Sequence, residues 1–274
     1  MKDGKYGGVM QAEIQGQAAY HAEELTLQGF TCIEGVINQH ALADWRDRID
    51  TIYAAQENAL GRDQLCRIGD QDLCRAPLLY DDTFLSLAAN PTVLNIVRRL
   101  LGEFVTLHLQ NGIISRPGIR HYQSSWHRDL PYQNFVISRP LAISALFALD
   151  AFSSETGGTM LLPFSQKMEV MPSPAYVERH SQTASMGAGG VLLFDSMLFH
   201  RAGFNRSTAL RRGINHVYSI PIIKQQYDFP RHFHHRADFD PQLRQLLGFT
   251  SAVALDDYTW RQARLDRLAH EPNT

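Results

Sequence analysis

The chain has 274 residues, of which 44% are hydrophobic and 20% are charged, which is enough apolar material for one sizeable core. Its formal net charge of −2 gives no basic surface of the kind that attracts nucleic acid or an anionic membrane. No apolar run approaches the roughly 18 residues that a membrane-spanning helix needs, so no such helix is predicted.

Residues 1–15 are polar and contain glycine, which predicts a loose N-terminus without the apolar stretch of a secretory signal. Cys32, Cys66 and Cys74 form an odd, sparse set, which argues against a disulfide scaffold and favours reduced thiols. Both observations predict a cytoplasmic protein. There is no internal repeat or low-complexity linker, so residues 16–274 are expected to form a single domain.

The first hundred or so residues are expected to be mainly helical. Helices are predicted over residues 17–28, 38–60 and 92–101. Asn38 is placed to cap the second helix, Pro91 stands near the start of the third, and Gly102 follows its end. A short strand is expected over residues 30–33, whereas the mixed charges of residues 61–80 favour an irregular segment.

From residue 104 onward, apolar β-rich stretches alternate with Gly, Pro, Ser and Asn. They span residues 104–115, 141–149, 158–163, 191–199 and 213–220. Several strands in succession without intervening helices are typical of an antiparallel sandwich or barrel. We therefore predict a mainly β fold with helical flanks, a β-core over about residues 104–222, and a tail of mixed helix and loop.

Two segments far apart in the sequence carry possible metal ligands. The run SSWHRD contains His127 and Asp129, which point to the same side of an extended segment and can converge on one ion. His200 ends the apolar run GVLLFDSMLFH, where a barrel mouth can collect side chains from distant strands. Two histidines and one carboxylate with open positions form the facial triad of non-haem Fe(II) oxygenases. The alternative is a purely structural set of two hydrogen-bonded histidines and a turn aspartate.

Arg211 follows His200 across a polar turn and is expected to face the same cavity from the next strand, whereas Arg212 should point to the opposite face. A guanidinium can hold a carboxylate through two parallel hydrogen bonds. The distal carboxylate of 2-oxoglutarate needs such a partner while its 2-oxo acid end chelates iron. The sequence therefore predicts Fe(II), 2-oxoglutarate and O₂ as cofactor and cosubstrates.

Together with the run ETGGTMLLP at residues 155–163, residues 190–194, Asn205 and Ser207, these motifs resemble the phytanoyl-CoA dioxygenase (PhyH-like) family of Fe(II)/2-oxoglutarate oxygenases. The resemblance extends from Gln28 to about Gly248. It implies a double-stranded β-helix (jelly-roll, cupin-like) core. It also implies the following site residues: iron held by His127, Asp129 and His200, and the cosubstrate held by Arg211, with further contacts from Gln110 and Arg116.

The sequence departs from the family pattern at two places. Where the family usually has Pro-Gly-Ser-His-Lys, this chain has PFSQK, with Phe164 and Gln166 at the changed positions. Ala202 lacks the hydroxyl group that often follows the second histidine. Both changes leave the triad intact, but they put in doubt the part this loop plays in shaping the pocket and one hydrogen bond to the cosubstrate.

The predicted function is that of an Fe(II)- and 2-oxoglutarate-dependent dioxygenase that hydroxylates or otherwise oxidises a small polar metabolite and releases succinate and CO₂. Asp129 favours hydroxylation over halogenation, because a carboxylate fills the position that a halide would need. The candidate substrate contacts lie near the first motif: Tyr122, Arg128, Tyr132 and Gln133. Two alternatives stay open, a cupin-type metal protein with non-redox chemistry such as isomerisation and a non-catalytic binding module on the same barrel.

Overall fold

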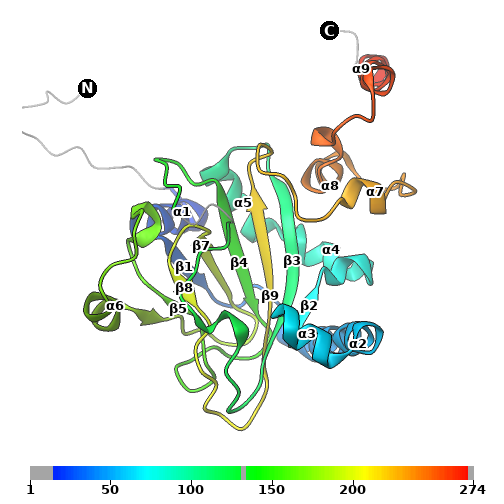
Figure 1. The fold of residues 1–274 in the computed structure, drawn as a ribbon. Coiled ribbons are helices and arrows are strands. Elements are labelled where there is room, and N and C mark those ends of the chain that lie inside the picture. Colours follow the sequence, from blue (N-terminus) through cyan, green and yellow to red (C-terminus); the bar gives the residue numbers. More distant parts are fainter. Residues whose placement is uncertain (1–14, 131–133, 271–274) are drawn as a thin grey trace, which may run out of the picture.

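Two antiparallel sheets organise the computed structural model, which describes residues 15–130 and 134–270 (Figure 1). The larger sheet has the strand order β1-β7-β4-β9-β3-β2, and the smaller has the order β6-β5-β8. The larger sheet consists of β1 (Phe30–Ile33), β2 (Leu73–Arg75), β3 (Thr106–Ser115), β4 (Ala142–Ala148), β7 (Val191–Asp195) and β9 (Arg211–Ser219). The smaller sheet consists of β5 (Met160–Leu161), β6 (Gln182–Thr183) and β8 (His200–Arg201).

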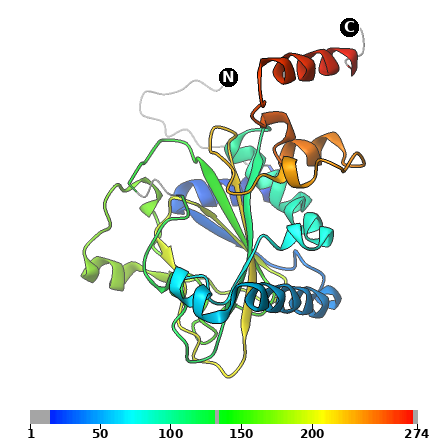
Figure 2. The same cartoon turned by 45° about the vertical axis from the view of Figure 1, so that its right-hand side comes forward.

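Helices from the first part of the chain cover one face of the larger sheet (Figures 1 and 2). They are α1 (Gln17–Gln28), α2 (Leu42–Leu60), α3 (Arg62–Ile68), α4 (Leu85–Ala88) and α5 (Pro91–Leu101). The apolar stripe of α2, including Ile49, packs in one cluster with Phe147 of β4 and Tyr218 of β9. Gly112 of β3 lies beneath α2, because a side chain there would meet Ile49 at 2.6 Å.

Between the other face of the larger sheet and the smaller sheet lies the region that contains His127, Asp129, His200 and Arg211. Helix α6 (Pro174–His180) flanks the smaller sheet, and the tail forms α7 (Phe229–His232), α8 (Pro241–Leu246) and α9 (Asp257–His270). Helix α9 stands apart from the sheets in both views (Figures 1 and 2). Short 3₁₀ turns are η1 (Gln39–Ala41), η2 (Pro77–Leu79), η3 (Asp82–Phe84), η4 (Tyr122–Ser124), η5 (Ser165–Lys167) and η6 (Phe249–Ser251).

The predicted antiparallel core with helical flanks is confirmed, with one local error. Residues 61–80 were expected to be irregular, but they contain α3 and β2. Strand β2 is short and is defined mainly by its pairing with β3, where Cys74 lies opposite Gly112. Such pairing between distant segments leaves little local signal in so short a run.

Within the described part of the chain, no helix is long and apolar enough to cross a membrane. The cytoplasmic location and the division into a loose N-terminus and one domain stay predictions, and residues 1–14 of that terminus lie outside the described residues.

Candidate metal centre

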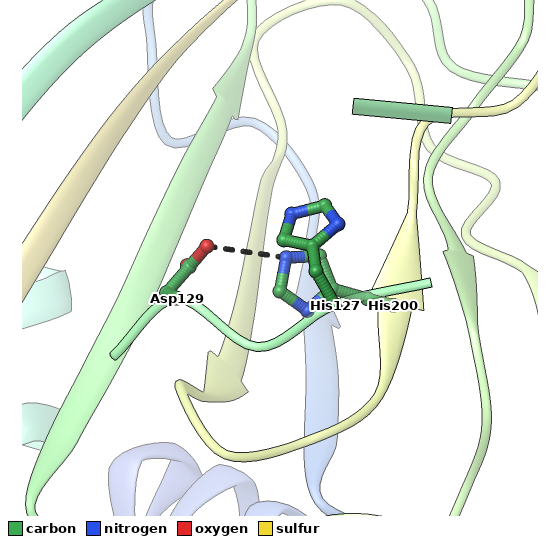
Figure 3. Close-up of side chains that lie close together, drawn as sticks. All are labelled: His127, Asp129 and His200. Atoms are coloured by element: carbon green, nitrogen blue, oxygen red, sulfur yellow. Dashed lines mark ion pairs between the residues drawn. The ribbon is translucent and has the colours of Figure 1, made fainter. Parts of the chain in front are cut away.

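Main-chain hydrogen bonds bring the two metal-ligand motifs together. His127 and His200 form an antiparallel bridge in which each backbone N–H donates to the other residue's carbonyl, at 2.9 and 3.0 Å. Two residues further along, the N–H of Asp129 donates to the carbonyl of Ser196 at 2.9 Å. The segment is therefore extended, and the side chains of His127, Asp129 and His200 gather in one place as predicted (Figure 3).

Both imidazole rings are oriented by carbonyl groups. Nδ1 of His127 lies 2.8 Å from the carbonyl oxygen of Ser125, and Nδ1 of His200 lies 2.9 Å from that of Leu198. These contacts place the hydrogen on Nδ1 and leave the lone pair of a neutral ring on Nε2. Nε2 of His127 is buried without a partner, and the ligand atoms of the triad all lie within 4.8 Å of one another. The donor set therefore fits one ion bound by two imidazoles and a carboxylate.

Charges in the triad are coupled. Burial opposes protonation of His200, but Asp129 outweighs it and raises the pKa of His200, whose Nε2 lies 3.2 Å from Oδ1 of Asp129. Burial would raise the pKa of Asp129, yet His200 and His127 together with a hydrogen bond from Ser144 hold it below its usual range. Burial and the neighbouring His200 lower the pKa of His127. In the metal-free chain, Asp129 and His200 thus each favour the charged form of the other.

The carboxylate of Asp129 has a further support that the sequence analysis missed. Ser144 of β4 donates its hydroxyl to Oδ2 of Asp129 at 2.5 Å, and its Oγ lies 2.8 Å from Oγ of Ser196. One possible signal was present, because Ser144 is a polar residue in a strand that is otherwise apolar. A buried hydroxyl in such a strand needs a hydrogen-bond partner, and here that partner is the carboxylate.

Arg211 lines the same cavity as the triad, hereafter the metal cavity. Its Nη2 donates to the carbonyl of Gly157 at 2.8 Å, its guanidinium lies 4.5 Å from the ring centre of Phe152, and its buried Nε has no partner. Burial lowers the pKa of Arg211 to about 10, so it stays cationic at neutral pH. Among the described residues, no carboxylate lies within ion-pair distance of it. A buried cation of this kind is costly unless an anion joins it.

Asn215 was also missed. It lies on β9 four positions after Arg211, so alternation places both side chains on the cavity face of the strand. Asn215 lines the metal cavity, and its buried Oδ1 has no partner. Three buried polar atoms around the metal cavity therefore have no hydrogen-bond partner: Oδ1 of Asn215, Nε of Arg211 and Nε2 of His127.

Gln110 does not lie where the resemblance implied. It sits on the helix-covered face of β3, where its Nε2 donates to the carbonyl of Phe84 and lies 2.7 Å from Nε2 of His216. Its Oε1 accepts a hydrogen bond from the N–H of Leu78. The side chain is therefore on the wrong face of the sheet to touch a molecule in the metal cavity. The predicted contact of Gln110 with the cosubstrate does not fit this placement, and its side chain instead has a structural role.

Arg116 also lies outside the residues that line the metal cavity. Its Nε forms an ion pair with Oδ1 of Asp72 at 2.7 Å, next to the end of β3. The carboxylate that this guanidinium holds is therefore supplied by the chain itself, and the predicted contact with the cosubstrate does not fit this placement.

The proposed substrate contacts are not brought together either. Arg128 lies between His127 and Asp129 on an extended segment, so its side chain points the other way. It is buried and donates to the carbonyls of Met197, Ser165 and Met168, which fastens two loops to each other. Tyr122 lies in η4, and neither residue lines the metal cavity. Tyr132 and Gln133 lie outside the described residues.

The departure from the family pattern at residues 163–167 has a local structural meaning. Phe164 has a φ of 64°, in the left-handed region that glycine adopts without strain, and its side chain is exposed. Gln166 is buried, and its Nε2 donates to the carbonyls of Thr26 and Leu27 at the end of α1. In this chain the loop thus fastens the first helix to the smaller sheet.

Comparison with known proteins assigns this architecture to a family. The chain belongs to the phytanoyl-CoA dioxygenase (PhyH) family, which it matches over residues 25–213. The predicted resemblance is therefore confirmed.

Individual relatives cover most of the chain. A protein of Mycobacterium tuberculosis described as uncharacterised is 35% identical over 251 residues, which are 86% of this chain and 89% of that protein. The dioxygenase af480 of Aspergillus fumigatus is 24% identical over 236 residues, 81% of this chain and 74% of that protein. The epimerase SnoN, solved with Fe³⁺, alpha ketoglutarate and nogalamycin RO, superposes with a TM-score of 0.58 at 18% identity, covering 74% of this chain and 84% of that one. This likeness supports the predicted jelly-roll fold.

Proposed function

We propose that the chain is an Fe(II)- and 2-oxoglutarate-dependent oxygenase that oxidises a small organic molecule with O₂ and forms succinate and CO₂. The proposal rests above all on one observation. Three metal-ligand side chains have their donor atoms within 4.8 Å of one another, beside a buried guanidinium that has no carboxylate partner. A facial triad and a cation for the far end of a dicarboxylate are the two parts that this chemistry requires.

Each group has a defined task in this proposal. His127, Asp129 and His200 hold the iron, which supplies the activation of O₂ when it is bound. The carbonyls of Ser125 and Leu198 keep both imidazoles turned with Nε2 toward the ion.

The cosubstrate is held from the other side of the metal cavity. Arg211 binds the distal carboxylate of 2-oxoglutarate, and Asn215 offers its amide group to the same molecule. Apolar walls, which include Phe194 and Leu146, limit the entry of water.

Hydroxylation is the outcome we propose for the substrate. Asp129 fills the position that a halide would take, so halogenation is disfavoured. The related dioxygenase names support oxygen chemistry, whereas the structural neighbour SnoN is described as an epimerase. The products of the two reactions differ in mass, because hydroxylation adds one oxygen atom from ¹⁸O₂ and epimerisation adds none.

The first experiment is an anaerobic titration of the full chain with Fe(II) and then 2-oxoglutarate. We expect a weak visible charge-transfer band, followed on admission of O₂ by iron-dependent formation of succinate. Compounds are then screened for those that stimulate succinate release. The products formed from these compounds under ¹⁸O₂ are analysed by mass spectrometry. Succinate formation that does not depend on iron, or the absence of both band and succinate, contradicts the proposal.

A further inference from the structure

A basic cavity of about 490 Å³ adjoins the metal cavity, and the two share Arg201 and Ala202. It is called the arginine cavity here because Arg120, Arg201 and Arg206 line it. Its lining residues in the described part of the chain include no aspartate or glutamate. A concave surface with charges of one sign concentrates ions of the opposite sign.

These three arginines lack ion-pair partners among the described residues. Arg120 donates only to the hydroxyl of Ser124, and the guanidinium of Arg206 lies 5.6 Å from the ring centre of Phe204. Several arginines elsewhere in the described chain are instead paired with carboxylates, among them Arg46, Arg48, Arg75, Arg116, Arg212 and Arg236. The arginine cavity therefore brings together three guanidinium groups that no carboxylate of its lining neutralises.

Arg201 is the innermost of the three and follows the metal ligand His200 directly. Its guanidinium lies 5.2 Å from the ring centre of Trp126, Nη2 lies 3.2 Å from Sδ of Met160, and its buried Nε has no partner. Aromatic and thioether neighbours hold the side chain in place without neutralising its charge. The Nε of Arg201 is thus a positioned donor that lacks an acceptor.

His121 adds a neutral donor to the arginine cavity. Its Nδ1 accepts a hydrogen bond from the N–H of Gln123 at 3.2 Å, which places the ring hydrogen on Nε2. That Nε2 is buried without a partner. The carbonyl of Gln123 in turn accepts from the N–H of Ala202 at 2.9 Å, which ties this histidine to the wall shared with the metal cavity.

A second cavity of about 750 Å³ lies next to α6 and extends to His127, and we call it the α6 cavity. It shares Met160 and Arg201 with the arginine cavity, so these two side chains form the boundary between them. Its walls are mainly apolar, and they include Trp126, Met171, Val177 and Phe199. A cavity of this size and character suits the apolar body of a small organic ligand.

We propose that the arginine cavity binds a carboxylate or phosphate group of the substrate, whose apolar part occupies the α6 cavity beside His127. This inference rests on the proposed function and specifies its substrate class as an amphipathic anion. It revises the expectation of a polar metabolite, because the cavity that reaches the metal site is largely apolar. The arginines supply affinity for the charged end, and the α6 cavity places the apolar part against the metal site.

A matched pair of probes tests this inference, decanoate and decanol, which share a chain length and differ in charge. Binding to the full chain with Fe(II) and 2-oxoglutarate is measured without O₂, by the change in the visible band and in tryptophan fluorescence. We expect decanoate to bind at least about tenfold more tightly than decanol, since one charge-assisted contact is worth that much. The preference should shrink as the salt concentration rises. Equal binding of the two probes overturns the proposal.

Single substitutions then test which arginines bind the charged group of decanoate. Arg201→Gln should abolish the preference for decanoate, and Arg120→Gln and Arg206→Gln, on exposed side chains, should reduce it without affecting folding. Arg116→Gln is the matched control, because that guanidinium is paired with Asp72 away from both cavities. An unchanged preference in Arg201→Gln that folds normally, judged by its thermal unfolding, contradicts the inference.

The same arginines could instead serve 2-oxoglutarate on its way to Arg211. In that case Arg120→Gln and Arg206→Gln weaken 2-oxoglutarate binding and leave the preference for decanoate unchanged, which rules out the substrate subsite. Failure of the proposed function is a different result, namely no iron-dependent band or succinate. The comparison of decanoate with decanol can then still be made on the metal-free chain by fluorescence.

Discussion

The two faces of the larger sheet differ in how their buried polar side chains are paired, although Nδ1 of His216 on the helix-covered face is also without a partner. On the helix-covered face, Gln110 of β3 lies opposite His216 of β9 and the two side chains contact each other at 2.7 Å. On the cavity face, the Nε of Arg211 and the Oδ1 of Asn215 have no partner. Because native proteins rarely leave buried polar atoms unpaired, a group of them around one cavity marks a place that a ligand completes.

Two buried histidines show the same contrast in their charge. Burial lowers the pKa of His216 to about 3, so this ring is neutral at any ordinary pH. His200 is equally enclosed, but Asp129 outweighs burial and raises its pKa. The adjacent carboxylate, and not the extent of burial, therefore accounts for the opposite pKa shifts of these two histidines.

We expect the largest effects when His200 and His216 are replaced in turn. His200→Ala should lower iron-dependent succinate formation by at least about 100-fold, because one of three ligands is lost. His216→Ala should retain iron binding but lose about 2–4 kcal/mol of stability, since it opens a cavity and leaves Gln110 without its partner. Metal content, succinate yield and urea unfolding check both. Full turnover in His200→Ala would refute the site assignment.

Arg211 should show the next largest effect. We expect Arg211→Met to weaken 2-oxoglutarate binding by about 2–3 kcal/mol, or about 30- to 150-fold, with iron still bound. The same change should leave the stability of the metal-free chain equal or higher, because it removes a buried cation that has no paired carboxylate. Anaerobic titration and urea unfolding measure the two quantities. A loss of stability without a loss of 2-oxoglutarate affinity would show that Arg211 is structural.

Acid should weaken the helix-covered face through His216. Its folded pKa of about 3 lies below the unfolded value of about 6.5, so the unfolded chain takes up the proton first as pH falls. The contribution is complete above about pH 6.5 and declines toward pH 3, by up to about 1.4 kcal/mol per pH unit. His121, with a pKa lowered to about 4 by burial and by the nearby Arg211, adds to this slope above that value.

The check is urea unfolding of the metal-free chain between pH 7 and 4.5, compared with His216→Gln. The variant should have a shallower dependence on pH than the parent chain. Identical slopes would mean that His216 takes up its proton over the same pH range in the folded and the unfolded chain, which contradicts the lowered pKa.

Arg116→Gln should have the smallest effect of these substitutions. It tests whether Arg116 differs from Arg211 in its contribution to 2-oxoglutarate binding. We expect a change of less than about threefold in 2-oxoglutarate affinity and a loss of at most about 1 kcal/mol of stability, because the ion pair with Asp72 is partly exposed. The same titration and unfolding experiments apply. A tenfold weaker affinity for 2-oxoglutarate would restore the cosubstrate role that the family resemblance implied.

Much of this architecture could be predicted because its signals are local. The helix at Gln17–Gln28 and the strand at Phe30–Ile33 have the predicted bounds. The spacing of His127 and Asp129 in an extended segment also predicts that both side chains point the same way, as they do. Arg211 was predicted to lie beside the triad, since a single turn separates it from His200.

The errors come from features that depend on tertiary structure. Gln110 was assigned by its position in a motif, but a strand shows alternate residues to opposite faces, so an offset of one residue moves a side chain to the other side of the sheet. The ladder between β3 and β9 has an irregularity between Leu107 and Leu109, which no local pattern reveals. Ser144 supports Asp129 from a strand that is close only in the folded chain.

The reciprocal main-chain bonds between His127 and His200 have one more consequence. Because the backbone itself keeps the two imidazoles side by side, the geometry of the centre does not depend on an ion to assemble it, unlike that of a zinc finger. A molecule that has lost its iron through oxidation therefore keeps its shape and can be reloaded. Activity should return when ferrous iron and a reductant are added, without a cycle of unfolding and refolding.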